Sequence, residues 1–209
     1  ALPAVEGKAV LFNIFAGVEA FPVCLATQDP EEIVAAVKVI APTFGGICLD
    51  DIAAPQCFLV EDRLKQEIDI PVFHDDQHGT AVVVLAGLLN ALKVVGKKLP
   101  SARVVVSGAG AAGIAIARLL LVAGATRLVV CDSRGAIYHG RQAGMNWAKE
   151  ALARVTNREK QKGSLAEAIR GADVFIGASA GGAVSVEMVR SMAKDPIVFA
   201  LANPIPEIS

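Results

Sequence analysis

The sequence predicts an α/β protein, with a Rossmann-type doubly wound parallel sheet in its C-terminal half and a smaller α/β portion before it. Strand-like and helix-like segments alternate along all 209 residues, which is the order that builds parallel sheets covered by helices. A glycine-rich loop at residues 108–113 follows one such strand and opens a helix. The chain is 54% hydrophobic with a mean hydropathy of +0.51, which is enough for a core in one or two domains.

Composition and charge exclude several classes of function. The 20 Lys and Arg side chains nearly balance the 21 Asp and Glu, so the sequence offers no basic field for a nucleic acid. The longest unbroken apolar run, residues 81–89, is about half of what a bilayer crossing needs, and no signal peptide is visible. We therefore expect a cytoplasmic protein that acts on a small molecule, without a nucleic-acid or membrane partner. Each cysteine lies in or beside an apolar run, which predicts buried free thiols at Cys24, Cys48, Cys57 and Cys131.

The first domain is predicted over residues 1–95, and its elements alternate between strand and helix. Pro at the first helical position and Thr27 or Asp29 as the cap mark one helix start clearly. The predicted elements are a strand or helix at 8–15, a strand at 21–27, a helix at 30–40, a strand at 45–52, a helix at 54–68, a strand at 70–76 and a helix at 79–98. The last helix carries no charge before Lys93, so we expect it to be buried on all sides between two sheets.

The second domain is predicted over residues 96–209, after a polar hinge with Gly and Pro at 96–102. Its strand–helix order is that of a doubly wound sheet. The predicted elements are a strand from residue 103 into the glycine loop, a helix at 111–125, a strand at 127–133, helices at 144–155 and 164–170, a strand at 172–179, a helix at 184–193 and a strand at 196–203.

The glycine loop fits the dinucleotide fingerprint G-x-G-x-x-G. Its first glycine permits the tight turn, its second lets the backbone approach a pyrophosphate, and its third lets the helix pack closely on the strand. The N-terminus of the following helix then supplies N–H donors to the phosphates. The structural alternative is a glycine-rich turn without a ligand. The predicted cofactor-binding residues of the loop are Gly108, Ala109, Gly110, Ala111, Ala112 and Gly113.

An acid stands where a dinucleotide site usually has one. Asp132 lies 19 residues beyond Gly113, at the end of the next strand, and is predicted to accept the ribose hydroxyls. This favours NAD. Ser133 and Arg134 follow, and since an arginine there would accept a 2′-phosphate, NADP remains the alternative.

Polar residues also follow the two later strands of this domain. Ser179, with Ala180, is expected to line the cofactor groove through its small size. Asn203 is predicted to hold the nicotinamide or the substrate through its amide, and the alternative is a turn asparagine before proline.

Two pairs of carboxylates end two predicted strands of the first domain. Asp50 and Asp51 end one strand, and Asp75 and Asp76 end the other. The carboxyl ends of parallel strands share one edge, so these carboxylates would repel one another unless they held a cation such as Mg²⁺ or Mn²⁺. The alternative is that they cap helices and form turns.

Basic side chains accompany these carboxylates. His74 and His78 flank the second pair and are expected to cap or orient neighbouring groups, with a zinc site as the alternative. Lys8 opens an apolar segment, which is typical of a lysine that snorkels to solvent. Facing a carboxylate and a cofactor, it would instead serve as a general base, its pKa lowered by burial and neighbouring cations.

Seven segments carry a resemblance to a known family: EGKAVLF, FAGVEAFPV, APTFGGICLDDI, PVFHDDQHGTA, SGAGAAGIAIA, GADVFIGAS and ALANPIPEI, in this order along the chain. They closely resemble malic enzymes of the bacterial and archaeal type. The resemblance implies oxidative decarboxylation of L-malate to pyruvate and CO₂, with reduction of NAD or NADP and a divalent metal. It maps the catalytic lysine onto Lys8, its partner acid onto Asp75, and the metal ligands onto Asp50, Asp51 and Asp76.

The chain departs from the family pattern in places. The family usually has Glu-Asp where this chain has Asp50-Asp51, and the family's catalytic tyrosine is not matched by Tyr138, the only tyrosine present. We therefore expect a chain truncated at both ends. The alternatives are an inactive dinucleotide-binding fragment and another metal-dependent 2-hydroxy-acid dehydrogenase. The apolar composition favours a homodimer or higher homo-oligomer.

Overall fold

A computed structural model of the chain describes residues 2–208 as two compact units, one that ends at Asp75 and one that begins at Asp76. Each unit contains a sheet, of two strands in the first and five in the second, so the predicted α/β class is confirmed. The division lies earlier than the predicted boundary at residues 95–96. The reason is that the helix after residue 75 packs within the second unit. Its Gly87 lies against the ring of Phe199, so that a Cβ added to this glycine would be 3.4 Å from the ring.

The first unit is built on two short parallel strands, which pair so that Leu49 lies opposite His74. The helices α2 and α3 pack on them through an apolar core that includes Val34, Val60 and Leu64. The elements are α1 (Leu2–Leu11), the π-helical turn η1 (Phe12–Ala16), α2 (Pro30–Ile40), the 3-10 turn η2 (Ala41–Thr43), β1 (Ile47–Leu49), α3 (Gln56–Glu67) and β2 (Val72–His74).

The start of the first unit differs in part from the sequence prediction. Residues 8–15, left open between strand and helix, are helical, and Asp29 caps α2 by accepting from Glu31 N at 2.7 Å and Glu32 N at 3.2 Å. The predicted strand at 21–27 is wrong, because the segment forms no strand. Its apolar side chains are exposed, so their alternation does not face a core: Phe21, Val23 and Leu25.

The second unit contains a five-stranded sheet in the order β5-β4-β3-β6-β7. Four strands run parallel, as predicted, and β5 pairs antiparallel to the end of β4, which the sequence did not predict because it is only two residues long. The elements are α4 (Asp75–Val94), β3 (Arg103–Ser107), α5 (Ala111–Val122), β4 (Arg127–Asp132), β5 (Gly135–Ala136), α6 (Trp147–Val155), α7 (Leu165–Ile169), β6 (Val174–Gly177), α8 (Val186–Arg190) and β7 (Ile197–Ala200).

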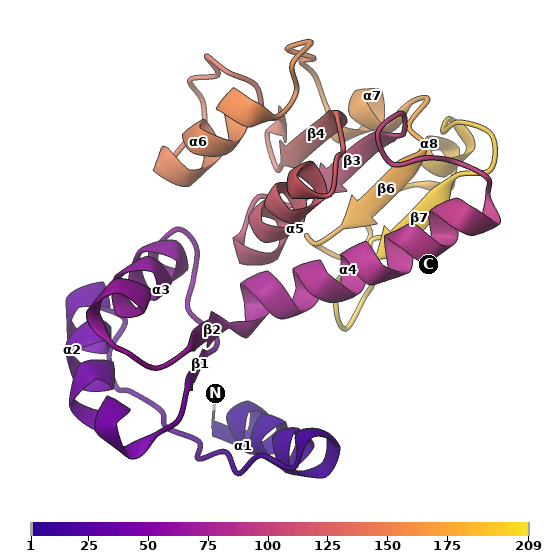
Figure 1. Cartoon of the computed structure of the whole chain (residues 1–209). Helices are drawn as coiled ribbons and strands as arrows, with labels where there is room; N and C mark the ends of the chain where they lie inside the picture. Colours follow the sequence, from indigo (N-terminus) through magenta and orange to yellow (C-terminus); the bar gives the residue numbers. More distant parts are fainter. Residues whose placement is uncertain (1, 209) are drawn as a thin grey trace. The chain divides into compact units, whose positions relative to one another are not determined.

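Helices cover both faces of this sheet. Figure 1 shows α4 and α5 on one face and α7 and α8 on the other. Alternate strand residues such as Val105 and Phe175 pack with Ile169 of α7 and with Met192 just after α8, forming one continuous core. The strands therefore carry apolar residues on both faces, as a buried parallel sheet requires.

The prediction that the long apolar helix is buried on all sides is wrong for α4. Its buried residues include Ala81, Val84, Leu88 and Leu92, which form a single stripe at helical spacing, whereas Val83 is 66% exposed. By length and composition alone, α4 is the one described helix that would suffice to cross a membrane. A buried stripe against a sheet is what the core helix of a globular domain has.

All four cysteines are free thiols, as expected, but only two of them are buried. Cys57 and Cys131 lie in the cores of the two units, whereas Cys24 and Cys48 are exposed, which corrects the prediction for these two. Burial raises the pKa of the Cys131 thiol to about 12, with the neighbouring Asp132 charge adding to the effect.

A fully buried carboxylate holds the carboxyl ends of β6 and β7 together. Glu207 accepts hydrogen bonds from Ser179 N at 2.9 Å and from Ala202 N at 3.0 Å. Gly177 leaves the space that the carboxylate fills, because a Cβ there would overlap it. Glu207 thereby satisfies two backbone donors that the strand ends leave without a ladder partner.

We expect Glu207→Ala to lower the free energy of unfolding by about 1–3 kcal/mol, because it leaves these two N–H groups without an acceptor. Chemical denaturation followed by circular dichroism measures the change. The matched control is Glu159→Ala, which removes an exposed carboxylate of the same unit. Equal stability losses in the two variants would contradict the role assigned to Glu207.

Candidate cofactor and catalytic site

The parallel strands of the second unit bring their carboxyl ends to one edge. The register pairs Ser107 with Cys131 and with Gly177, and Gly177 with Ala200. Every residue predicted to contact a cofactor ends or follows one of these four strands, so the structure gathers them along this edge.

The glycine loop makes the turn from β3 to α5 that the fingerprint predicts. Gly108 has φ +116, and a Cβ on it would overlap the carbonyl oxygen of Ala178. A Cβ on Gly113 would overlap the carbonyl oxygen of Gly108, so α5 lies directly against the loop. The loop is also tied to the next strand, because Gly108 N donates to Cys131 O at 2.8 Å.

The N-terminus of α5 suits a phosphate group. No side chain caps it: Gly110 is the N-cap residue, and a Cβ on Gly110 would have nothing within 4 Å. Of the loop alanines, Ala109 precedes this position and Ala111 and Ala112 form the first turn. Short side chains and uncapped N–H groups leave room and donors for a pyrophosphate.

Asp132 ends β4, as predicted, and both of its carboxylate oxygens are engaged by neighbouring donors. Arg141 binds it with two parallel N–H groups, one of them at 2.8 Å from Oδ1. Lys149 Nζ lies 2.7 Å from Oδ2, and Arg134 N lies 2.9 Å from Oδ1. Burial by itself would raise the pKa of this carboxyl, but the hydrogen bonds from Arg141 and Lys149 outweigh it and hold the pKa well below its ordinary range. The neighbouring Ser133 is exposed.

Sequence reasoning missed Arg141, Lys149 and Glu207. The two cations lie 9 and 17 residues beyond Asp132, and no periodicity links them to it. Glu207 carried a weak signal, as an acid between Pro206 and Ile208 in an apolar segment.

The residues after β6 and β7 border the same edge. The hydroxyls of Ser179 and Ser107 lie 3.1 Å apart, so the ends of β3 and β6 are joined by a side-chain hydrogen bond. Asn203 is exposed, as a residue that contacts a ligand must be. Its role towards the nicotinamide or the substrate stays a prediction.

In the first unit, Lys8 lies between two of the predicted carboxylates. Its Nζ is 2.6 Å from Asp50 Oδ1 and 2.7 Å from Asp75 Oδ2. The expected lowering of the lysine pKa is not observed: burial lowers it, but the hydrogen bonds to Asp50 and Asp75 outweigh burial and raise the pKa above its ordinary value. Lys8 is therefore an ammonium here, and it compensates two carboxylates at once.

The predicted metal ligands do not form a metal centre by themselves. Within residues 2–208, no group of three or more His, Cys, Asp or Glu side chains is placed to hold a metal ion. Asp50 and Asp51 belong to the first unit, with Asp51 at φ 56, and Asp76 belongs to the second. The same finding covers the zinc alternative at His74 and His78, and both metal assignments stay predictions. His74 is buried, and its backbone N donates to Glu61 at 3.2 Å.

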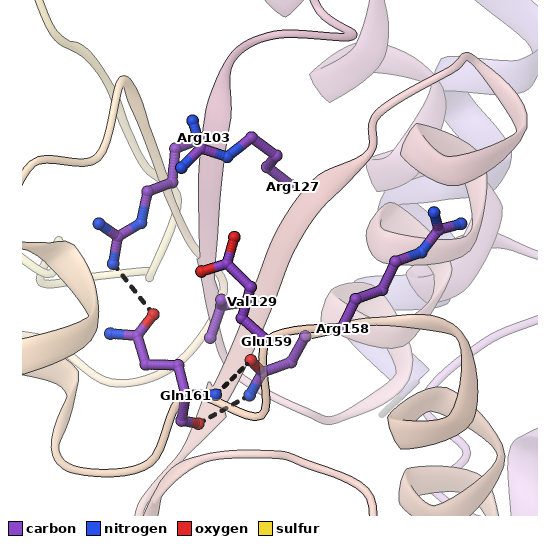
Figure 2. Close-up of a pocket in the computed structure, with 7 residues that line it drawn as sticks. Arg103, Arg127, Val129, Arg158, Glu159 and Gln161 are labelled. Carbon is purple, nitrogen blue, oxygen red and sulfur yellow. Dashed lines mark hydrogen bonds between the residues drawn. The ribbon is translucent and has the colours of Figure 1, made fainter.

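A small pocket opens at the opposite edge of the five-stranded sheet (Figure 2). Arg103 begins β3 and Arg127 begins β4, so this is the amino edge. Arg103 donates to Gln161 at 3.0 Å, and Arg158 points away from the other two arginines (Figure 2). The pocket is therefore separate from the glycine loop, and its groups mainly fasten the segment after α6 to the sheet. Its lining residues are Arg103, Arg127, Val129, Asn157, Arg158, Glu159 and Gln161.

Comparison with known proteins gives a consistent result. The family model described as malic enzyme, NAD binding domain, matches residues 77–208. A bifunctional malic/malolactic enzyme of Bacillus subtilis is 61% identical over 208 residues, which are 100% of this chain and 51% of that protein. An NADP-dependent malic enzyme of Rhizobium meliloti is 51% identical over 209 residues, 99% of this chain and 27% of that protein.

A solved malic enzyme structure matches the fold of the whole chain. The crystal structure of an NAD-dependent malic enzyme from Thermotoga maritima matches with a TM-score of 0.97 at 48% identity, over 100% of this chain and 56% of that one. The chain thus spans about half the length, or less, of these relatives.

The glycines of the loop should separate into two kinds when they are replaced by alanine. Gly110→Ala should leave stability unchanged, because its Cβ meets open space, and weaken NAD binding about tenfold, because the methyl group fills the phosphate cradle. Gly113→Ala should cost about 1–3 kcal/mol of stability through overpacking. Thermal unfolding and calorimetric titration with NAD measure both effects. A destabilised Gly110→Ala variant that still binds NAD normally would contradict this assignment.

Asp132 should make stability depend on pH. The folded pKa lies below the ordinary value of 3.8, so its stabilising effect is fully present above that value and is lost as the pH falls towards the folded pKa. Asp132→Asn should lower the free energy of unfolding at neutral pH by about 2 kcal/mol, because two cations lose their partner. It should also flatten the decline in stability below about pH 4, where the parent protein loses the contribution of Asp132. Parallel pH profiles for variant and parent would contradict this expectation.

Proposed function

The chain belongs to the malic enzyme family, and from this premise we propose that an enzyme containing it oxidatively decarboxylates L-malate to pyruvate and CO₂. The proposed electron acceptor is NAD or NADP, since both appear in the names of the relatives. The observation that carries the proposal is the ion-paired cluster of Lys8, Asp50 and Asp75, which a nucleotide-binding domain alone would not need.

The cofactor, when bound, would accept a hydride from C2 of the substrate. The N-terminus of α5 and the open space at Gly110 support binding of its pyrophosphate. Lys8 is an ammonium in this structure, so the proposal requires that it first release a proton. As the neutral amine, Lys8 is proposed to take the proton of the C2 hydroxyl, and Asp75 is proposed to hold it in place.

The proposal includes a divalent cation, Mg²⁺ or Mn²⁺, on Asp50, Asp51 and Asp76. Support comes from the resemblance and from the chemistry of the donors, since all three are carboxylates and hard cations prefer oxygen ligands. When bound, such a cation would polarise the C2 oxygen and stabilise the enolate that decarboxylation leaves.

We also propose that the enzyme is a homo-oligomer. The segment around η1 exposes a run of apolar side chains, with Ile14 65% and Phe15 82% exposed, and α1 has no buried residue. Exposed apolar surface of this extent is typical of a protein–protein interface.

Replacing the lysine tests the catalytic proposal. Lys8→Met should lower malate-dependent reduction of the dinucleotide by about 10²–10⁴-fold, because it removes the proton-exchanging group. NAD binding by calorimetry should be unchanged. Lys38→Met is the matched control, since Lys38 pairs with Glu67 on the surface of the same unit at 2.7 Å. Full turnover in Lys8→Met would refute the assignment.

Substrate and metal are tested in a separate assay. Turnover of L-malate should require added Mg²⁺ or Mn²⁺ and should stop with a chelator, because the cation is proposed to stabilise the enolate. Isocitrate and tartrate should give less than about a tenth of the malate rate, since each places an extra group where malate has hydrogen. Turnover that persists in chelator argues against the metal, and faster turnover of isocitrate or tartrate argues for a different 2-hydroxy-acid dehydrogenase.

A further inference from the structure

Glu207 lies where two segments meet, residues 178–184 after β6 and residues 201–207 after β7, which we call the β6–β7 junction. Its side chain is fully buried. One carboxylate oxygen, Oε1, accepts from Ser179 N at 2.9 Å, and the other, Oε2, accepts from Ala202 N at 3.0 Å. Each oxygen binds a different segment, so a single carboxylate fixes the spacing between the two.

Other contacts of the β6–β7 junction leave little freedom for a different spacing. Val184 N donates to the backbone carbonyl of Glu207 at 2.9 Å. A Cβ on Gly181 would lie 2.7 Å from the Cβ of Ile205, so the two segments pack directly against each other. A group that changes shape or hydrogen bonding inside the junction must therefore move at least one of the segments.

The junction connects two residues predicted to contact the cofactor with the strand that enters the glycine loop. The hydroxyl of Ser179 lies 3.1 Å from that of Ser107, the last residue of β3, and 3.4 Å from Oε1 of Glu207. On the other side, Ala202 directly precedes Asn203. The carboxylate thus links the end of β3 to the segment that carries Asn203.

The strand order indicates which half of a dinucleotide these segments would meet. In sheets of this kind the pyrophosphate lies at the glycine loop and the acid at the end of the next strand takes the adenosine ribose. Here these are the ends of β3 and β4, whereas β6 and β7 lie on the other side of β3 (Figure 1). A dinucleotide that extends along this edge therefore places its nicotinamide half at the ends of β6 and β7.

From this placement we propose that Glu207 is a positioning residue for the nicotinamide half of the cofactor. It holds Ser179 and Asn203 in place at the carboxyl edge, and it does not touch the cofactor itself, because it is fully buried. This inference rests on the proposed function for the presence of a dinucleotide. It deepens that function by naming a residue that acts on cofactor binding from behind the site.

A short nucleotide separates the two halves of the cofactor without any catalytic step. The purified full chain is titrated by calorimetry with NAD, with NADP and with adenosine 5′-monophosphate, which lacks the nicotinamide half. Glu207→Gln keeps the shape of the side chain but puts an NH₂ group in place of one acceptor, so one backbone N–H loses its partner. We expect this variant to bind the dinucleotides about tenfold more weakly and the monophosphate within about twofold of the parent.

A matched control distinguishes positioning from a general loss of stability. Asn157 is also buried in the second unit and also holds a segment through backbone hydrogen bonds, one of them to Ile137 O at 2.9 Å. It lies in the pocket at the amino edge of the sheet (Figure 2). Asn157→Ala should lower the thermal unfolding temperature and leave the affinities for all three nucleotides within about twofold of the parent.

Two further variants test the route through the junction. Gly181→Ala leaves Glu207 intact but forces residue 181 away from Ile205, so it should reproduce the selective loss of dinucleotide binding and stays informative if Glu207→Gln unfolds. Asn203→Ala should also weaken dinucleotide binding. If Glu207 acts through the segment that carries Asn203, the double variant should lose clearly less affinity than the product of the two single losses.

The outcomes separate this inference from the function on which it rests. A folded Glu207→Gln variant with parental dinucleotide affinity overturns the inference while the dinucleotide site stands. Equal losses for dinucleotides and monophosphate, the same loss in Asn157→Ala, or independent losses in the double variant also overturn it. If the parent chain binds none of the three nucleotides, the cofactor part of the proposed function fails together with the inference.

Discussion

Four parallel strands end at one edge of the larger sheet, and the cofactor site depends on that alignment. Hydrogen bonding in register fixes where β3, β4, β6 and β7 stop relative to one another. Loops from distant parts of the sequence then meet without further adjustment. The alignment needs β3 to turn sharply into α5, and only glycines at 108 and 113 allow the loop and helix to come so close.

Buried carboxylates complete this edge. Glu207 satisfies backbone N–H groups that follow β6 and β7, while Asp132 gathers Arg141 and Lys149 at the end of β4. Asp132 is compensated by cations, whereas Glu207 is satisfied by backbone N–H groups, and partners of this kind are what a buried polar group requires. Both acids therefore accept hydrogen bonds from donors at strand ends, Asp132 on the β4 side of the glycine loop and Glu207 on the β6 side. Their positions decide which polar groups remain available to a ligand.

In the smaller unit, a lysine compensates the carboxylates that follow the two strands. Asp50 directly follows β1 and Asp75 directly follows β2, and Leu49 lies opposite His74, so parallel pairing alone brings the two carboxylates together. The Lys8 ammonium bridges them at 2.6 and 2.7 Å. A cluster with two acids and one cation retains a net negative charge, and this favours a further cation nearby. The adjacent Asp76 adds another carboxylate by sequence alone.

The sequence by itself determined the α/β order, the glycine loop and the acids that end the strands. These depend on local rules: strand alternation, turn chemistry and the close approach that only glycine permits. It did not reveal that residues 21–27 form no strand or that α4 buries a single stripe of residues. It also did not reveal that Arg141 and Lys149 bind the carboxylate of Asp132. Those outcomes depend on which side chains the folded chain brings together. A one-dimensional pattern contains no information on which donors surround a carboxylate, so only the tertiary structure decided the partners of Asp132.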